Sequence, residues 1–168
     1  MKSFPMFIRT SGRRVTIVGG GEQAAQKARL ILKTDAQILL VAPELEPELQ
    51  GLVAEGRARH QRHLTTQVFE DVAMGFIATG CPALDVSAHA LAKAVRCPVN
   101  VVDRLELCTF IMPAIIARSP MLVAVSSGGA APLLSRVLKA RLETSIPAGL
   151  GRLADFASAC RDKVKAAI

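Results

Sequence analysis

Tryptophan and tyrosine are absent from this chain of 168 residues, and its aromatic content is only 4%. Proteins that hold single-stranded nucleic acid usually stack the bases on aromatic side chains. The formal net charge of +7 still indicates an anionic partner, such as nucleic acid, a membrane surface or a polyacidic small molecule. A nucleic-acid-binding protein is supported by this charge alone, so nucleic acid is the least favoured of these partners.

Cysteine pairs with metal-site spacing are also missing. We expect reduced, structural thiols rather than a metal or disulfide framework from the four cysteines, Cys81, Cys97, Cys108 and Cys160. No metal-ligand spacing relates the histidines, His60, His63 and His89, so we predict no metal site. No run reaches the roughly 20 apolar residues of a membrane span, and the N-terminus does not resemble a signal peptide. We expect a cytoplasmic protein without a membrane partner.

Hydrophobic residues make up 51% of the chain, which is enough for a substantial core. As far as residue 102, short β-branched runs alternate with stretches that have helical periodicity. Strands are predicted at 14–18, 36–41, 58–63, 72–79 and 99–102, and helices at 22–33, 46–55 and 82–95. This alternation predicts an α/β fold with a doubly wound parallel sheet.

The rhythm changes after Asp103. Two strand-like runs, 109–117 and 121–126, flank a turn signal at Arg118-Ser119-Pro120, so we predict a hairpin. A helix is predicted at 131–144, and Pro147 is expected to begin a last helix. The α/β part should therefore end near Pro113 and be followed by a smaller α+β part.

A glycine turn, Gly19-Gly20-Gly21-Glu22-Gln23-Ala24, follows the first strand and opens the first helix. It fits the dinucleotide-binding pattern G-x-G-x-x-A in the required context. Gly19 would allow the tight turn, Gly21 the approach of a pyrophosphate, and Ala24 close packing of helix and strand. Free N–H groups at the helix start would favour the phosphate charge. The alternative is a glycine turn without a ligand.

The acid that binds the ribose hydroxyls usually lies about 20 residues beyond the glycine turn. Here the nearest candidate is Glu44, just after the second strand. No arginine follows that strand to receive a 2′-phosphate, which favours NAD over NADP. Glu44 can equally be a charge at a helix N-terminus without a ligand role.

Asp103 follows the apolar run Val99 to Val102. A buried strand tolerates little charge, so we expect this carboxylate at the strand's end, at a surface or in a cleft. It either caps the next turn or performs chemistry. Farther on, the turn Ser126 to Gly129 either cradles a carboxylate with its backbone N–H groups or is an ordinary turn with a serine cap.

Three segments carry a family resemblance: VTIVGGGEQAAQKARLIL, VNVVDRLELCTFIMPAIIARSPMLVAVSSGGAAPLLSRVLKARLE and IPAGLGRLADFASACRDKVK. In this order and spacing they resemble the siroheme synthase N-terminal domain family. Its members are precorrin-2 dehydrogenases, some of which are also sirohydrochlorin ferrochelatases. The resemblance runs from about Phe4 to Lys165.

The resemblance implies a Rossmann-type NAD-binding domain at 1–113, a dimerisation segment at 114–145 and a helical tail at 146–168, which is short relative to the family. It implies NAD-dependent dehydrogenation of precorrin-2 to sirohydrochlorin by a homodimer, with Fe²⁺ only as a possible substrate of a chelatase step. The substrate is an anionic tetrapyrrole, which suits a basic protein. The alternative is a non-catalytic module that binds NAD or tetrapyrrole.

Site residues follow from the same resemblance. The family's active-site aspartate falls on Asp103, where it would accept the proton that leaves as a hydride is transferred. The substrate would contact Ser127 and Gly128. The chain departs from the family at Ala78 to Pro82, where many members carry acids beside the cofactor. The basic clusters at residues 57–63 and 136–141 receive no assignment. The implied cofactor contacts are Gly19, Gly20, Gly21, Glu22, Gln23, Pro43, Glu44 and Thr79.

Overall fold

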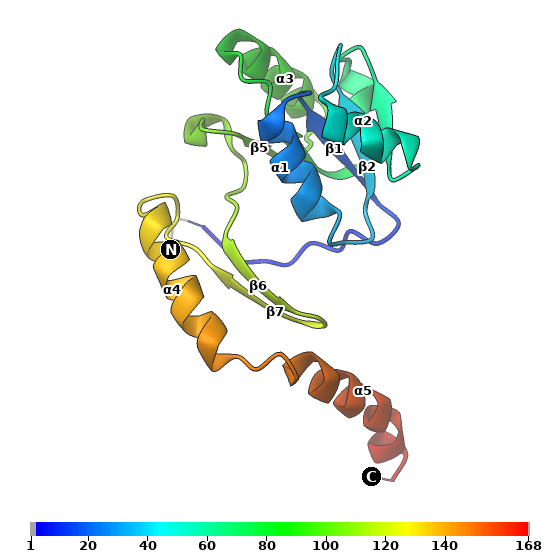
Figure 1. Cartoon of the computed structure of the whole chain (residues 1–168), viewed down its shortest axis with the longest axis vertical. Coiled ribbons are helices and arrows are strands. Elements are labelled where there is room, and N and C mark those ends of the chain that lie inside the picture. The colour runs from blue at the N-terminus through cyan, green and yellow to red at the C-terminus, as the bar shows by residue number, and fades with distance from the viewer. Residues whose placement is uncertain (1–2, 168) are drawn as a thin grey trace. The chain divides into compact units, whose positions relative to one another are not determined.

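The computed structural model describes residues 3–167, with side chains described as far as Arg161; residues 1, 2 and 168 of the predicted domains lie outside this range. The chain divides into two compact units, Phe4–Ile111 and a C-terminal unit from Met112 onward. Figure 1 shows their elements. The dimerisation role given to residues 114–145 stays a prediction.

Five strands of the first unit form one parallel sheet in the order β3-β2-β1-β4-β5. The predicted α/β fold with a doubly wound parallel sheet is confirmed. The chain moves outward from β1 to β3, returns to β4 beside β1, and moves outward again to β5. Its elements are β1 (Arg14–Val18), α1 (Glu22–Ile31), β2 (Gln37–Val41), α2 (Pro47–Ala54), β3 (Ala58–Gln61), the 3₁₀ helix η1 (Thr66–Phe69), β4 (Val72–Ile77), α3 (Pro82–Ala94), β5 (Val99–Val101) and the 3₁₀ helix η2 (Leu105–Leu107).

The central strands are apolar because helices cover a doubly wound sheet on both faces. All six residues of β4 are buried, as are the last four of β1. Thr16 is the polar exception in β1, and its hydroxyl donates a 2.5 Å hydrogen bond to the Val68 carbonyl in η1. The largest fully buried side chains include Phe69, Phe76, Ile17, Leu40 and Leu49.

The C-terminal unit is a hairpin followed by two helices. β6 (Ala114–Arg118) pairs antiparallel with β7 (Met121–Val125), and the two strands are followed by α4 (Pro132–Ser145) and α5 (Leu150–Ala167). The predicted hairpin and helices are therefore present. Arg118 of β6 lies 3.5 Å from Glu143 of α4, which ties that helix to the hairpin.

The predicted strand at 109–117 is wrong in its first half, because β6 begins only at Ala114. Thr109 instead closes the free edge of β5: its N–H donates to the Val99 carbonyl at 2.8 Å, and its hydroxyl accepts from the Val99 N–H at 2.7 Å. The Asn100 amide donates to the Phe110 carbonyl at 3.1 Å. Main-chain and side-chain groups together thus satisfy the hydrogen bonds of this edge, which a further strand would otherwise pair with.

Cys97 lies just beyond α3, and its side chain is buried in the apolar cluster between that helix and the sheet. Burial raises the pKa of its thiol from 9.0 to about 11, because the thiolate is poorly solvated there. The folded state therefore keeps the thiol proton at pH values at which the unfolded chain has lost it.

This shift makes stability depend on pH in the alkaline range. A raised pKa contributes stability that is intact below the unfolded value and is lost as the pH rises toward the folded value, here from about 9 to about 11. We expect the free energy of unfolding in urea to fall by about 2 kcal/mol more in the wild type than in Cys97→Ala over this interval. Parallel pH profiles of the two proteins would contradict the assignment.

Candidate functional site

The candidate site lies where the five parallel strands end. In a parallel sheet the carboxyl ends of all strands lie at the same edge. Ligands bind at this edge, at the point where the order of the strands reverses. Here that point lies between β1 and β4, the two central neighbours. The segments at this edge begin with Gly19 after β1, Ala42 after β2, Arg62 after β3, Ala78 after β4 and Val102 after β5.

Two of the three turn glycines are packed against backbone. Gly19 has a φ of +135°, and a Cβ built on it would lie 2.1 Å from the Ala78 carbonyl oxygen. A Cβ on Gly20 would lie 1.9 Å from the Glu44 carbonyl oxygen. Both positions therefore exclude any side chain, and the turn holds the ends of β1, β2 and β4 together.

Gly21 differs from its neighbours, because a Cβ there would meet nothing within 4 Å. It is the N-cap of α1 and its side-chain position is open. The first-turn N–H groups of a helix have no partner within the helix, and they carry partial positive charge. An open glycine before such a turn forms a cradle that fits a pyrophosphate, so the residues present suit a dinucleotide.

The carboxylate of Glu22 turns toward Arg29 of the same helix. The Arg29 Nη1 atom lies 2.9 Å from Glu22 Oε1, and its Nη2 atom lies 2.5 Å from Glu48 Oε2 in α2. Hydrogen bonds from Arg29 lower the pKa of both carboxyl groups. If Glu22 contacts a cofactor, its backbone N–H is the available group. Glu46 joins these two acids in a cluster of close carboxylates.

Asp103 occupies the turn that follows β5, with a left-handed φ of +58°. Its exposed carboxylate accepts a 3.4 Å hydrogen bond from Nε2 of Gln23 on α1. Within residues 3–161 no backbone N–H donates to it, so the capping alternative lacks its hydrogen bond. The structure thus brings together two residues assigned to the site, Gln23 and Asp103, from opposite ends of the fold's first unit.

Lys27 is a neighbour of Asp103 that the sequence did not single out. It lies one turn beyond Gln23 on α1, and its Nζ lies 5.9 Å from the centroid of the Phe76 ring. Burial lowers the pKa of this ammonium, while the charge of Asp103 opposes that shift. The carboxylate therefore has a partly desolvated positive charge nearby. Its i, i+4 spacing from Gln23 was the available signal.

Thr79 follows β4 beside the glycine turn, as its assignment to the cofactor requires. Its hydroxyl, however, donates to the Asp85 carboxylate at 2.7 Å and accepts from the Cys81 N–H at 3.1 Å. These bonds fix the start of α3. Asp85 is buried, with 6% exposure, and was not anticipated. The Thr79 backbone, which borders Gly19, is the part directed to the turn.

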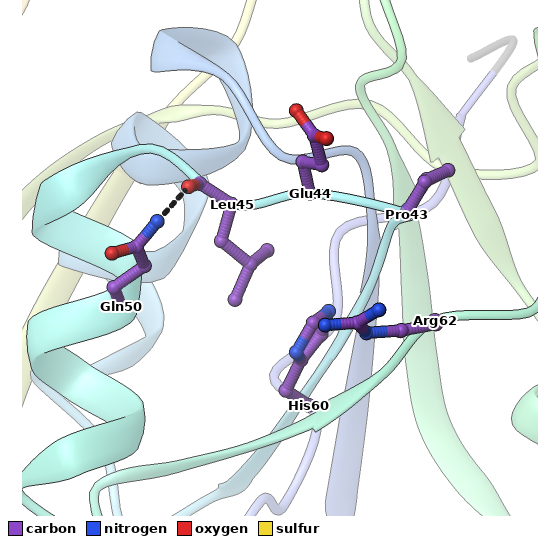
Figure 2. Close-up of a pocket in the computed structure, with 6 residues that line it drawn as sticks. All are labelled: Pro43, Glu44, Leu45, Gln50, His60 and Arg62. Carbon is purple, nitrogen blue, oxygen red and sulfur yellow. Dashed lines mark hydrogen bonds between the residues drawn. The ribbon is translucent and has the colours of Figure 1, made fainter.

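Pro43 and Glu44 line a pocket of about 290 Å³ at the ends of β2 and β3 (Figure 2). His60 and Arg62 line the same pocket from β3 and the residue beyond it. No arginine directly follows the second strand along the chain. The neighbouring strand supplies one, so the preference for NAD over NADP loses part of its basis.

Ser127 and Gly128 belong to the C-terminal unit. The Ser127 hydroxyl accepts a 2.9 Å hydrogen bond from the Ala131 N–H, and the Ser126 hydroxyl accepts one from Gly128 N–H at 3.1 Å. Gly128 has a φ of +66°, which suits glycine. These contacts are those of a serine-stabilised turn before α4, and the substrate contact assigned to Ser127 and Gly128 stays a prediction.

None of the described helices is both long and apolar enough to cross a membrane. The four cysteines, Cys81, Cys97, Cys108 and Cys160, are all free thiols. This agrees with the expectation that they form no disulfide framework.

A family described as "Putative NAD(P)-binding" matches residues 6–114, and the chain belongs to this family. A nicotinamide dinucleotide is thus the class of cofactor of this family, as predicted.

Over 98% of its length, the chain is 47% identical to a siroheme synthase of Methylobacillus flagellatus, and over 99% it is 45% identical to that of Chromobacterium violaceum. The chain spans 36% of each of these relatives. A solved structure named SirC, precorrin-2 dehydrogenase, shares the fold with a TM-score of 0.77 and 25% identity, over 95% of this chain and 79% of that one. The resemblance found in the sequence is confirmed.

The glycine turn allows a test of the cofactor cradle. Gly21→Val places a side chain in open space, so we expect the protein to fold while NAD⁺ binds about tenfold more weakly or worse, as measured by calorimetry. Gly51→Ala, a substitution in an equally open position of α2, is the matched control and should bind as the wild type does. Wild-type affinity in Gly21→Val would refute the cradle.

Proposed function

We propose that this chain dehydrogenates precorrin-2 to sirohydrochlorin with NAD⁺, as a step of siroheme synthesis. The observation that carries the proposal is the meeting of Asp103 and Gln23 at the sheet edge that also holds the glycine turn. The names of the similar proteins, siroheme synthase and precorrin-2 dehydrogenase, support the same reaction. Because the chain spans little over a third of the synthases, their other activities are not assigned to it.

The reaction removes two hydrogens from the reduced macrocycle, one as a hydride and one as a proton. When bound, the nicotinamide supplies the hydride acceptor. The Asp103 carboxylate takes the proton, so that precorrin-2 and NAD⁺ give sirohydrochlorin, NADH and H⁺. Gln23 orients this carboxylate through its hydrogen bond, and Lys27 places a positive charge near it.

Charge supports a tetrapyrrole substrate. The chain carries a net charge of +7, and precorrin-2 is a polycarboxylate, so long-range attraction would favour their encounter. Ser127 and Gly128 are proposed to receive one of its carboxylates at the turn before α4. A chelatase step, in which Fe²⁺ would be a substrate, is not part of this proposal.

A homodimer and a cytoplasmic location complete the proposal. β7 and α4 leave large apolar side chains exposed, which is typical of a surface that pairs with another copy. Four free thiols suit a reducing compartment. Light scattering of the purified chain tests the dimer, and a monomer at micromolar concentration would contradict it. The exposed apolar residues are Met121, Leu122, Leu133, Leu134, Val137 and Leu138.

Asp103→Asn tests the base. Asparagine tolerates the left-handed φ of this turn, so we expect the variant to fold and to bind NAD⁺ as the wild type does. Turnover of precorrin-2, followed anaerobically by NADH formation, should fall by about 100-fold or more, because the amide cannot accept the proton.

Glu106→Gln provides the matched control, since Glu106 is an exposed carboxylate paired with Arg104 and contacts none of the assigned residues. It should turn over as the wild type does. Equal turnover by Asp103→Asn and the wild type would remove Asp103 from the chemistry. Absence of NADH formation in the wild type, with both ligands still bound, would favour the alternative of a non-catalytic binding module.

A further inference from the structure

The pocket at the ends of β2 and β3 contains a charged group that the proposed reaction does not use. Arg62 is the first residue after β3, and its exposed side chain lines the pocket together with Leu45 and His60. Among residues 3–161, no carboxylate forms an ion pair with its guanidinium. The five N–H donors of this group are therefore available to an anion.

Glu44 lines the same pocket, but its carboxylate does not face the guanidinium of Arg62. Figure 2 shows the Glu44 carboxylate pointing away from Leu45, His60 and Arg62, so that it is chiefly the main chain of Glu44 that faces them. His60 is held in place by a 2.9 Å hydrogen bond between its Nε2 and the Ala42 carbonyl oxygen. A carboxylate aimed into the pocket would repel a phosphate, whereas this arrangement presents a guanidinium to it.

The segment that lines the pocket also contacts the glycine turn. The Glu44 carbonyl lies against Gly20, and the Glu46 N–H donates a 2.8 Å hydrogen bond to the Gly20 carbonyl. A dinucleotide whose pyrophosphate rests on the glycine turn has one ribose attached directly to each phosphate. In dinucleotide-binding folds the end of the second strand contacts the adenosine ribose. Here that position corresponds to residues 43–45, which line the pocket that contains Arg62.

We propose that Arg62 binds the 2′-phosphate of NADP⁺, so that this chain accepts NADP⁺ as well as NAD⁺. A guanidinium can bind a phosphate through two parallel hydrogen bonds, which a ribose hydroxyl cannot match. Arg62, which follows β3, would therefore determine whether the site accepts NADP⁺. In most dinucleotide-binding folds, a residue at the end of the second strand, here β2, has this role. The inference rests on the proposed function, since it requires that the glycine turn binds a nicotinamide dinucleotide.

The test measures the dissociation constants of NAD⁺ and NADP⁺ by calorimetry on the full chain. We expect the wild type to bind both. Arg62→Ala should raise the ratio of the NADP⁺ constant to the NAD⁺ constant by about tenfold or more, because a charge-assisted contact is lost only to NADP⁺. Arg62→Lys, which keeps the charge but not the paired hydrogen bonds, should give an intermediate ratio.

Arg59→Ala is the matched control. Arg59 is an exposed arginine of the same strand and does not line the pocket, so its removal lowers the net charge equally and should leave the ratio within about twofold. An equal rise of the ratio in Arg59→Ala would overturn the proposal, because net charge would then explain it. A ratio unchanged in Arg62→Ala would also overturn it.

Binding of the two nucleotides to the wild type distinguishes failure of this inference from failure of the proposed function. Binding of NAD⁺ without measurable binding of NADP⁺ would overturn the role of Arg62 and leave the dehydrogenase proposal intact. Binding of neither nucleotide would refute the proposed function and this inference together.

Discussion

Close contact between the glycine turn and two neighbouring backbone segments is the constraint on which the candidate site depends. Gly19 packs on the Ala78 carbonyl after β4, and Gly20 packs on the Glu44 carbonyl after β2. Any side chain at either position would push these strand ends apart. Since β1 lies between β2 and β4, the turn fixes the spacing of three strands at the edge where the chain reverses its winding.

With those ends fixed, α1 begins at the edge and directs Gln23 and Lys27 toward the turn after β5. Gln23 reaches Asp103 from the first turn, and Lys27 adds a positive charge one turn later. The exposed carboxylate is thus oriented by a neutral donor and lies near a partly buried cation, and no side chain described between residues 3 and 161 occupies its oxygens with a direct ion pair. This arrangement suits a group that must accept a proton from a substrate.

The local sequence predicts the strands, turns and helices that depend only on residues close together along the chain. The β-branched run, three glycines and helical periodicity of residues 14–33 specify a strand, a turn and a helix, and the structure has all three. The apolar run before Asp103 likewise predicts a carboxylate beyond a strand's end. Such arguments need only the period of the side chains and the conformational freedom of glycine.

Features that depend on strand order could not be predicted this way. Arg62 joins Glu44 in one pocket only because β3 pairs with β2, and periodicity does not state which strands are neighbours. The bond between Thr79 and Asp85 is local, but it depends on the conformation of the turn before α3, which periodicity does not state either. The segment 109–113 was predicted as a strand from its apolar character, yet side-chain hydrogen bonds from Thr109 and Asn100 hold it beside β5 instead.

The central claim is that a nicotinamide dinucleotide rests on the glycine turn at the carboxyl edge of the sheet. Hydrogen–deuterium exchange of the full chain, measured with and without saturating NAD⁺, tests it most directly. The account predicts slower exchange in peptides that cover residues 19–25, 42–46 and 78–81, because the cofactor would shield these backbone N–H groups. Unchanged exchange in all three, with protection elsewhere in the chain, would contradict it.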